Sequence, residues 1–284
     1  MNNLLKTLIS INHNEIYTRN YIKFILNKHN IPFKEDNYGN LFNFQFNNVP
    51  FLSSHMDTVK RNKTKNYNQC NNIIKSNDIL GGDDACGITI ILKLLLEKKL
   101  TFNWILTSRE EIGGIGSKAF CQHNQQLLQN QLYGLILDRK GNSDIICTQN
   151  QYGSKELEDN LFIIGKKYNY QPNRGIWSDA DQFSQYISCA NLSVGFYNQH
   201  TNNEYINLLD LENAYYYTKD IIQSLKFQFP MYTNYCELCG FPNESLVFVE
   251  SLQMEICTEC ANSLILELDS LIRREEYYDF DSIA

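Results

Sequence analysis

Long apolar runs are missing from this sequence. No stretch reaches the roughly 18 to 20 apolar residues that a membrane-spanning helix needs. The N-terminal residues 4–9 are too short and interrupted to serve as a secretory signal. With 43% hydrophobic and 20% charged residues over 284 positions, the composition is that of a globular chain. The sequence therefore predicts a cytoplasmic protein with one sizeable core and a small appendage.

An excess of positive charge is also missing. Lys and Arg number 25 against 32 Asp and Glu, which gives a net charge of -7 at pH 7. Because binding to a nucleic-acid backbone depends on clustered positive charge, this balance argues against nucleic acid as the main partner. The nine cysteines are unevenly spaced and odd in number, so they form a poor disulfide framework.

Apolar residues recur at helical spacing in some segments and form short continuous runs in others. We predict helices over residues 15–30, 84–98 and 207–227, and a further element of unassigned type over residues 156–166. We predict strands over residues 49–52, 102–106 and 132–137. This alternation predicts an α/β fold with a mixed, mostly parallel sheet flanked by helices. Composition changes after Pro230, which predicts a large domain over residues 1–229 and a small domain over residues 230–284.

Five polar motifs interrupt these elements, and four of them fall at or just after the carboxyl ends of apolar strands. Ligands bind at these ends in open α/β sheets. In chain order the motifs are Ser53-Ser54-His55-Met56-Asp57, Leu80-Gly81-Gly82-Asp83-Asp84-Ala85-Cys86-Gly87, Ser108-Arg109-Glu110-Glu111-Ile112-Gly113, Leu137-Asp138-Arg139-Lys140-Gly141 and Asn198-Gln199-His200-Thr201.

Each motif alone has an ordinary structural explanation. His55 could be a core histidine, Asp83 and Asp84 a helix N-cap, and Glu110 and Glu111 solvated charge. Taken together, the motifs supply the imidazoles and carboxylates that two closely spaced divalent metals and one general base require.

The chain resembles the dinuclear zinc exopeptidases, the group that contains bacterial leucyl aminopeptidase, peptidase T and glutamate carboxypeptidase. The resemblance covers roughly residues 50–210 and includes all five motifs in order. It implies that His55, Asp83 and Asp138 bind one metal and that Glu111 and His200 bind the other, with Asp83 bridging both. It also implies a cis peptide bond after Asp83.

The resemblance assigns catalytic roles to two further residues. Glu110 matches the general base, and Asp57 matches the aspartate behind the first histidine. Ala85 replaces a lysine that is common in the family, and Cys86 replaces a small residue, but neither is a ligand position. Ligands of this kind suit two zinc ions, with cobalt and manganese as alternatives.

The spacing of the motifs favours one subgroup. Relatives that cleave at a C-terminus often carry a lid domain between the fourth and fifth motifs, whereas here residues 139–199 are needed for the core. This favours a compact aminopeptidase-like enzyme. Arg174 begins a segment similar to a carboxylate-binding loop of lid-bearing relatives, and a surface arginine is an equal alternative. Asp179 and Asp181 either meet a substrate amine or cap the following helix, and we favour capping.

A separate signal lies near the C-terminus. Cys236-x-x-Cys239 and Cys257-x-x-Cys260 have the spacing of a four-cysteine zinc ribbon. Gly240 suits the tight turn of such a site. Four thiolates leave no open position on the metal, so this zinc would be structural. The alternative is four free or redox-active cysteines.

The remaining tail gives two weaker expectations. We predict an amphipathic helix over residues 263–274 and an exposed acidic end over residues 275–281. The ribbon either binds a protein partner or closes the fold, and the sequence leaves both open.

The sequence predicts a hydrolase that removes residues from a peptide terminus, with two active-site zinc ions and a third in the ribbon. One alternative is an amidohydrolase or deacylase that uses the same ligands and base on non-peptide amides. A second is a non-catalytic binding protein whose working part is the ribbon. This second alternative is disfavoured because the chain keeps every ligand and the base.

Overall fold

The computed structural model describes residues 1–59, 67–234, 236–239 and 246–266. The chain divides into two compact units, Met1–Tyr232 and Thr233–Ala284. None of the helices that the structure describes combines the length and hydropathy of a membrane-spanning segment.

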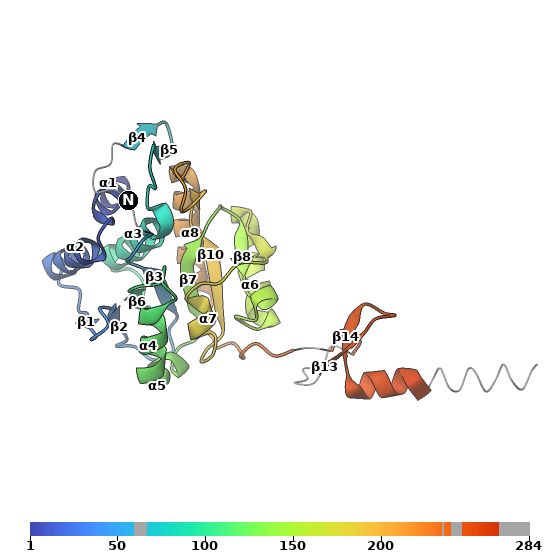
Figure 1. Cartoon of the computed structure of the whole chain (residues 1–284). Helices are drawn as coiled ribbons and strands as arrows, with labels where there is room; N and C mark the ends of the chain where they lie inside the picture. Colours follow the sequence, from blue (N-terminus) through green and yellow to red (C-terminus); the bar gives the residue numbers. More distant parts are fainter. Residues whose placement is uncertain (60–66, 235, 240–245, 267–284) are drawn as a thin grey trace, which may run out of the picture. The chain divides into compact units, whose positions relative to one another are not determined.

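An eight-stranded mixed sheet forms the centre of the first unit (Figure 1). In sheet order its strands are β1 (Lys34–Glu35), β2 (Leu41–Asn43), β6 (Asn103–Thr107), β3 (Phe51–His55), β7 (Gly134–Arg139), β10 (Cys189–Ser193), β8 (Asp144–Ile146) and β9 (Gln171–Asn173). The middle strands β6, β3, β7 and β10 are parallel, and the antiparallel pairs lie to either side of them. The expected mixed, mostly parallel sheet is confirmed.

Residues along the strands alternate between two apolar cores, one on each face of the sheet. Leu52 and Trp104 are partners in register and belong to the larger core. Their chain neighbours Phe51 and Ile105 belong to the smaller one. Successive strand side chains point to opposite faces, so apolar residues at both positions require cover on both sides of the sheet.

Helices provide that cover. Residues of α1 (Asn2–Ile11), α2 (Glu15–Lys28), α3 (Gly82–Glu97), α6 (Lys155–Gly165) and α8 (Leu208–Ser224) contribute to the larger core. Residues of α4 (Ile115–His123), α5 (Gln125–Gln129) and α7 (Ala180–Phe183) contribute to the smaller one. The three helices expected over residues 15–30, 84–98 and 207–227 are α2, α3 and α8, and the further element expected over residues 156–166 is α6. Helix α8 ends earlier than expected because Leu225 adopts an extended backbone conformation.

A second, four-stranded sheet positions two loops of the site. Its strands are, in order, β11 (Phe196–Tyr197), β12 (Tyr205–Asn207), β5 (Ile73–Ser76) and β4 (Tyr67–Cys70). The chain runs from β5 into α3, and the loop between β11 and β12 carries His200. Residues 139–199 supply strands and helices to this unit and form no separate lid domain.

The second unit contains an antiparallel hairpin of β13 (Leu246–Val249) and β14 (Met254–Cys257), followed by helical residues 258–266. Its buried apolar cluster consists of Cys236, Ile256 and Cys257.

Part of the expected tail falls outside the described residues. Residues 263–266 of the helix predicted over 263–274 are helical, and the rest of that segment is not described. Gly240 and the acidic segment 275–281 also lie outside the described residues.

Candidate metal centre and active site

Three parallel strands deliver polar side chains to one edge of the central sheet. His55 is the last residue of β3, and Asp138 lies next to the end of β7. Strand β6 leads into the loop that carries Glu110 and Glu111. Because these strands are adjacent and parallel, their carboxyl ends meet at the same edge, where α/β folds bind ligands.

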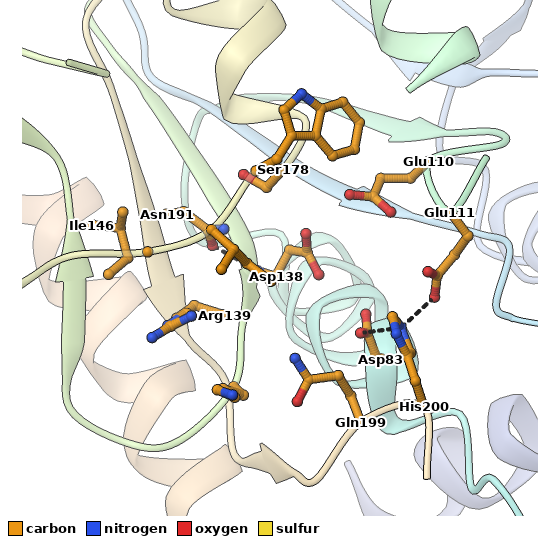
Figure 2. Close-up of a pocket in the computed structure, with 14 residues that line it drawn as sticks. Asp83, Glu110, Glu111, Asp138, Arg139, Ile146, Ser178, Asn191, Gln199 and His200 are labelled. Atoms are coloured by element: carbon orange, nitrogen blue, oxygen red, sulfur yellow. Dashed lines mark hydrogen bonds and ion pairs between the residues drawn. The ribbon is translucent and has the colours of Figure 1, made fainter. Parts of the chain in front are cut away.

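Asp83 lies between two histidines. Its Oδ1 is 2.9 Å from Nε2 of His55. Its Oδ2 is 3.1 Å from Nε2 of His200, the contact drawn as a dashed line in Figure 2. One carboxylate therefore faces two imidazoles with separate oxygens, as a carboxylate shared by two metals would. The peptide bond between Asp83 and Asp84 is cis, as the resemblance implies.

Two further carboxylates complete two sets of donors. Oδ1 of Asp138 is 3.4 Å from Nε2 of His55, and Oε1 of Glu111 is 2.9 Å from Nε2 of His200. Donor atoms of His55, Asp83 and Glu111 all lie within 4.8 Å of one another. The structure thus brings together the five residues that the sequence singled out as metal ligands.

Asp84, the second aspartate of the pair, forms hydrogen bonds within the fold. Its Oδ1 accepts a hydrogen bond from the backbone N–H of Gly87 at 2.9 Å, and its Oδ2 accepts one from the hydroxyl of Ser54. A donor atom of Asp84 also lies within 4.8 Å of donors of His55 and Asp138. Because Asp83 and Asp84 have non-helical backbone angles, the bond from Gly87 places Asp84 as a cap of the regular part of α3, while Asp83 faces the histidines.

The electrostatics of the cluster fit a site for cations. Burial, reinforced by neighbouring carboxylates, raises the pKa of Glu110 to about 10 and that of Asp138 to about 7. Hydrogen bonds to Asp83 and Glu111 raise the pKa of His200 to about 10. Burial lowers the pKa of His55, but Asp138 and Glu110 more than offset this and hold it well above its usual value. Imidazole and carboxylate donors without thiolates are a set that zinc accepts, and divalent cations would neutralise the crowded carboxylates.

The carboxylate of Glu110 points into a cavity beside this cluster (Figure 2). The residue is 8% exposed, and among the described residues no donor is hydrogen-bonded to its carboxylate. The cavity has a volume of about 60 Å³. Its lining consists of Asp83, Glu110, Glu111, Asp138, Arg139, Lys140, Ile146, Gly175, Ile176, Trp177, Ser178, Asn191, Gln199 and His200.

Asp57 lies between His55 and Glu110, the residue that the sequence predicts as the general base. The sequence predicts that its carboxylate orients the imidazole of His55, but Nδ1 of His55 lies closer to the backbone oxygen of Asp57, at 3.0 Å, than to its carboxylate, at 3.5 Å. The carboxylate instead accepts the backbone N–H groups of Glu110 and Glu111, at 2.9 and 3.1 Å. Asp57 therefore also fixes the loop that carries Glu110 and Glu111.

Sequence reasoning missed Glu204. This residue is fully buried, and its carboxylate accepts four backbone N–H groups of the turn before α3. The donors are Leu80, Gly81, Gly82 and Asp83, at 2.7, 2.9, 2.7 and 3.3 Å. Its one signal in the sequence is that an acidic residue follows shortly after His200. Its partners are backbone N–H groups far away in the chain, and such a contact leaves no pattern of side chains in the sequence.

The three residues that the sequence offers for substrate binding, Arg174, Asp179 and Asp181, do not line the cavity. Arg174 is exposed, and the segment Gly175 to Ser178 lines the cavity instead. Asp179 makes no side-chain capping bond, so the capping interpretation is wrong for this residue. Its carboxylate accepts the hydroxyls of Thr107 and Ser117, each at 2.5 Å.

Asp181 likewise has a structural role. Its Oδ2 accepts the backbone N–H of Ser178 at 2.9 Å and the hydroxyl of Tyr152 at 2.6 Å. These bonds hold the loop that lines the cavity, so Asp181 can affect the cavity only through that loop.

The second unit brings its four cysteines together. Ligand atoms of Cys236, Cys239, Cys257 and Cys260 lie within 4.8 Å of one another. The backbone N–H of Cys239 donates to Sγ of Cys236 at 3.5 Å, and that of Cys260 donates to Sγ of Cys257 at 3.4 Å. Four sulfurs in one cluster are a donor set suited to zinc.

No protein-family model matches the chain, and no curated protein matches its sequence. Solved structures do share its fold. The aminopeptidase PepT of Bacillus cereus gives a TM-score of 0.64 at 17% identity, over 78% of this chain and 96% of that one. A tripeptidase of Staphylococcus aureus gives 0.63 at 16% identity, also over 78% and 96%. A Thermotoga maritima protein described as an endoglucanase gives 0.56 at 14% identity, over 77% and 96%.

The chain therefore has an α/β fold of the type found in aminopeptidases and tripeptidases. At these identities the likeness is one of fold. Since proteins described by different activities share this fold, function has to be argued from the site.

Proposed function

We propose that this protein is a metal-dependent exopeptidase, most specifically an aminopeptidase with two zinc ions in its active site. The observation that carries the proposal is the placement of Asp83 between His55 and His200, with Asp138 and Glu111 beside them. One metal would be held by His55, Asp83 and Asp138, and the other by His200, Asp83 and Glu111.

Two divalent ions held by these residues would lower the pKa of a water molecule and would polarise the scissile carbonyl. Glu110 takes the proton of the attacking water and passes it to the leaving amine. Its position supports this role, because its carboxylate faces the cavity while Asp57 holds its backbone. Burial and nearby carboxylates raise the pKa of Glu110 to about 10 in the metal-free protein, and bound cations would lower it again, so that the ionised carboxylate could accept the proton.

The cysteine cluster would hold a third zinc ion with a structural role. Four thiolates fill the coordination sphere of tetrahedral zinc and leave no position for a substrate. Among the described residues of this unit, three are buried in its apolar cluster. Metal binding would therefore supply much of its folding free energy.

Metal analysis and a peptide digest test the proposal together. The full chain, stripped and then reconstituted with zinc at neutral pH, should hold about three equivalents, two of them readily exchangeable. It should remove N-terminal residues from peptides with a free amino group and leave N-acetylated peptides intact. Cleavage of N-acyl substrates alone would support the deacylase alternative. Fewer than two exchangeable equivalents would refute the dinuclear centre.

A further inference from the structure

The cavity beside the metal centre has two cations in its lining. Asp83, Glu111 and His200 lie on one side of the view in Figure 2, and Arg139 lies on the other, beyond Asp138. Lys140 follows Arg139 and also lines the cavity. A substrate whose carbonyl lies at the metal centre would therefore pass close to positive charge.

The two cations differ in whether they are already paired. Nε of Arg139 is 2.9 Å from Oδ2 of Asp144, and both side chains are mostly buried. Lys140 is exposed, and no carboxylate within the described residues forms an ion pair with its ammonium. Arg139 is thus neutralised by the protein, whereas Lys140 is available to a ligand.

Lys140 also borders a second hollow, of about 440 Å³, that adjoins the first. The lining of this hollow consists of Lys140, Asn198, Gln199, His200, Thr201 and Asn203. It contains amides, a hydroxyl, an imidazole and one ammonium, but no carboxylate. Lys140, Gln199 and His200 line both spaces, so a ligand held beside His200 can extend into the hollow.

The surroundings of Lys140 favour an anion at this position. Among the described residues, no carboxylate pairs with its ammonium or belongs to the lining of the second hollow, so this positive charge is not offset there. The unpaired charge attracts an anionic group of a ligand.

We propose that the ammonium of Lys140, together with the amide of Gln199, binds a carboxylate of the substrate. This inference rests on the proposed peptidase function. A peptide offers such a carboxylate from two sources, the free C-terminus of a short peptide or the side chain of an acidic residue. In either case the enzyme prefers substrates with a negative charge close to the scissile bond.

Matched peptides separate the two sources. The zinc-reconstituted full chain is assayed with Leu-Gly-Gly and its C-terminal amide, and then with the amides of Leu-Glu-Gly and Leu-Gln-Gly. An amidated C-terminus should lower kcat/KM about tenfold if the terminal carboxylate is bound. A glutamate should raise it about tenfold over glutamine if a side chain is bound. Either ratio should approach one in Lys140→Gln, because that variant lacks the charge.

The control is Lys99→Gln, which removes an exposed lysine that lines neither space and should leave both ratios unchanged. If neither pair of peptides is distinguished, or if Lys140→Gln keeps the distinction, the carboxylate site is refuted while the peptidase function stands. If no peptide is cleaved, the peptidase function fails. Calorimetric binding of the same peptides then tests the carboxylate site by itself. The site is refuted if the free and amidated peptides bind with equal affinity and the glutamate and glutamine peptides do so as well.

Discussion

The hydrogen bonds between Glu204 and the turn before α3 lead to a direct test of what holds Asp83 in position. Replacing Glu204 by Gln keeps the shape of the side chain and one oxygen, which can still accept two backbone N–H groups. The other end becomes an NH₂ group that faces two N–H donors. These two buried donors lose their acceptor, at about 1–3 kcal/mol each. We therefore expect a loss of about 2–6 kcal/mol in the free energy of unfolding.

The substitution should also weaken metal binding, because one of the four N–H groups belongs to Asp83. Denaturant unfolding of the metal-free protein and zinc titration against a chelator measure the two effects separately. Glu212→Gln changes an exposed glutamate of α8 and serves as the matched control, with an expected change below about 0.5 kcal/mol. If Glu204→Gln behaves like this control in both assays, Glu204 does not hold the turn.

Three further predictions follow from the same geometry. The Glu110→Gln variant should keep its metal and its fold but lose at least about 10²-fold in turnover. The Asp83→Ala variant should instead lose both active-site metals. Metal analysis and peptide turnover, measured on both variants, distinguish these results. In the folded, metal-free protein the pKa of Asp138 is raised from 3.8 to about 7, and that of His200 is raised from 6.5 to about 10. Both groups therefore bind protons more tightly in the folded chain than in the unfolded chain. Stability of the metal-free form should therefore fall as the pH rises, from about 4 to 7 through Asp138 and from about 6.5 to 10 through His200, and a flat melting profile over this range would contradict the assignment. A chain that ends after residue 232 should unfold cooperatively, retain two zinc equivalents and hydrolyse small peptides at near-normal rates. In the full chain, replacing both cysteines of the first Cys-x-x-Cys pair by serine should remove only the third zinc ion.

The parts of the fold that the sequence predicts are those whose signal is local. The parallel strands β3, β6 and β7 are short apolar runs, and α3 is apolar around most of its circumference, so composition alone indicates burial. The metal-centre residues could be found because each motif combines imidazoles or carboxylates with the end of a strand. Helix ends were less predictable, since α8 stops at Ser224 although apolar residues continue.

Contacts between distant segments could not be read from the sequence. Asp179 looks like a helix cap because it precedes a short helix, yet its carboxylate is taken by Thr107 and Ser117, which lie far away in the chain. Glu204 binds main-chain N–H groups, which every residue except proline carries, so its partners have no distinguishing side chain. Both residues became visible only when the fold placed these segments together.

The loop between β11 and β12 has a consequence for how the protein acquires its metals. This short loop carries His200, a ligand proposed for one ion, and Glu204, which clamps the turn bearing the ligand shared by both ions. An ion bound by His200 would therefore stabilise the same loop that holds Asp83 in position for the other ion. We expect the two proposed positions to bind metal cooperatively, and a zinc titration in which the half-filled form accumulates would contradict this expectation.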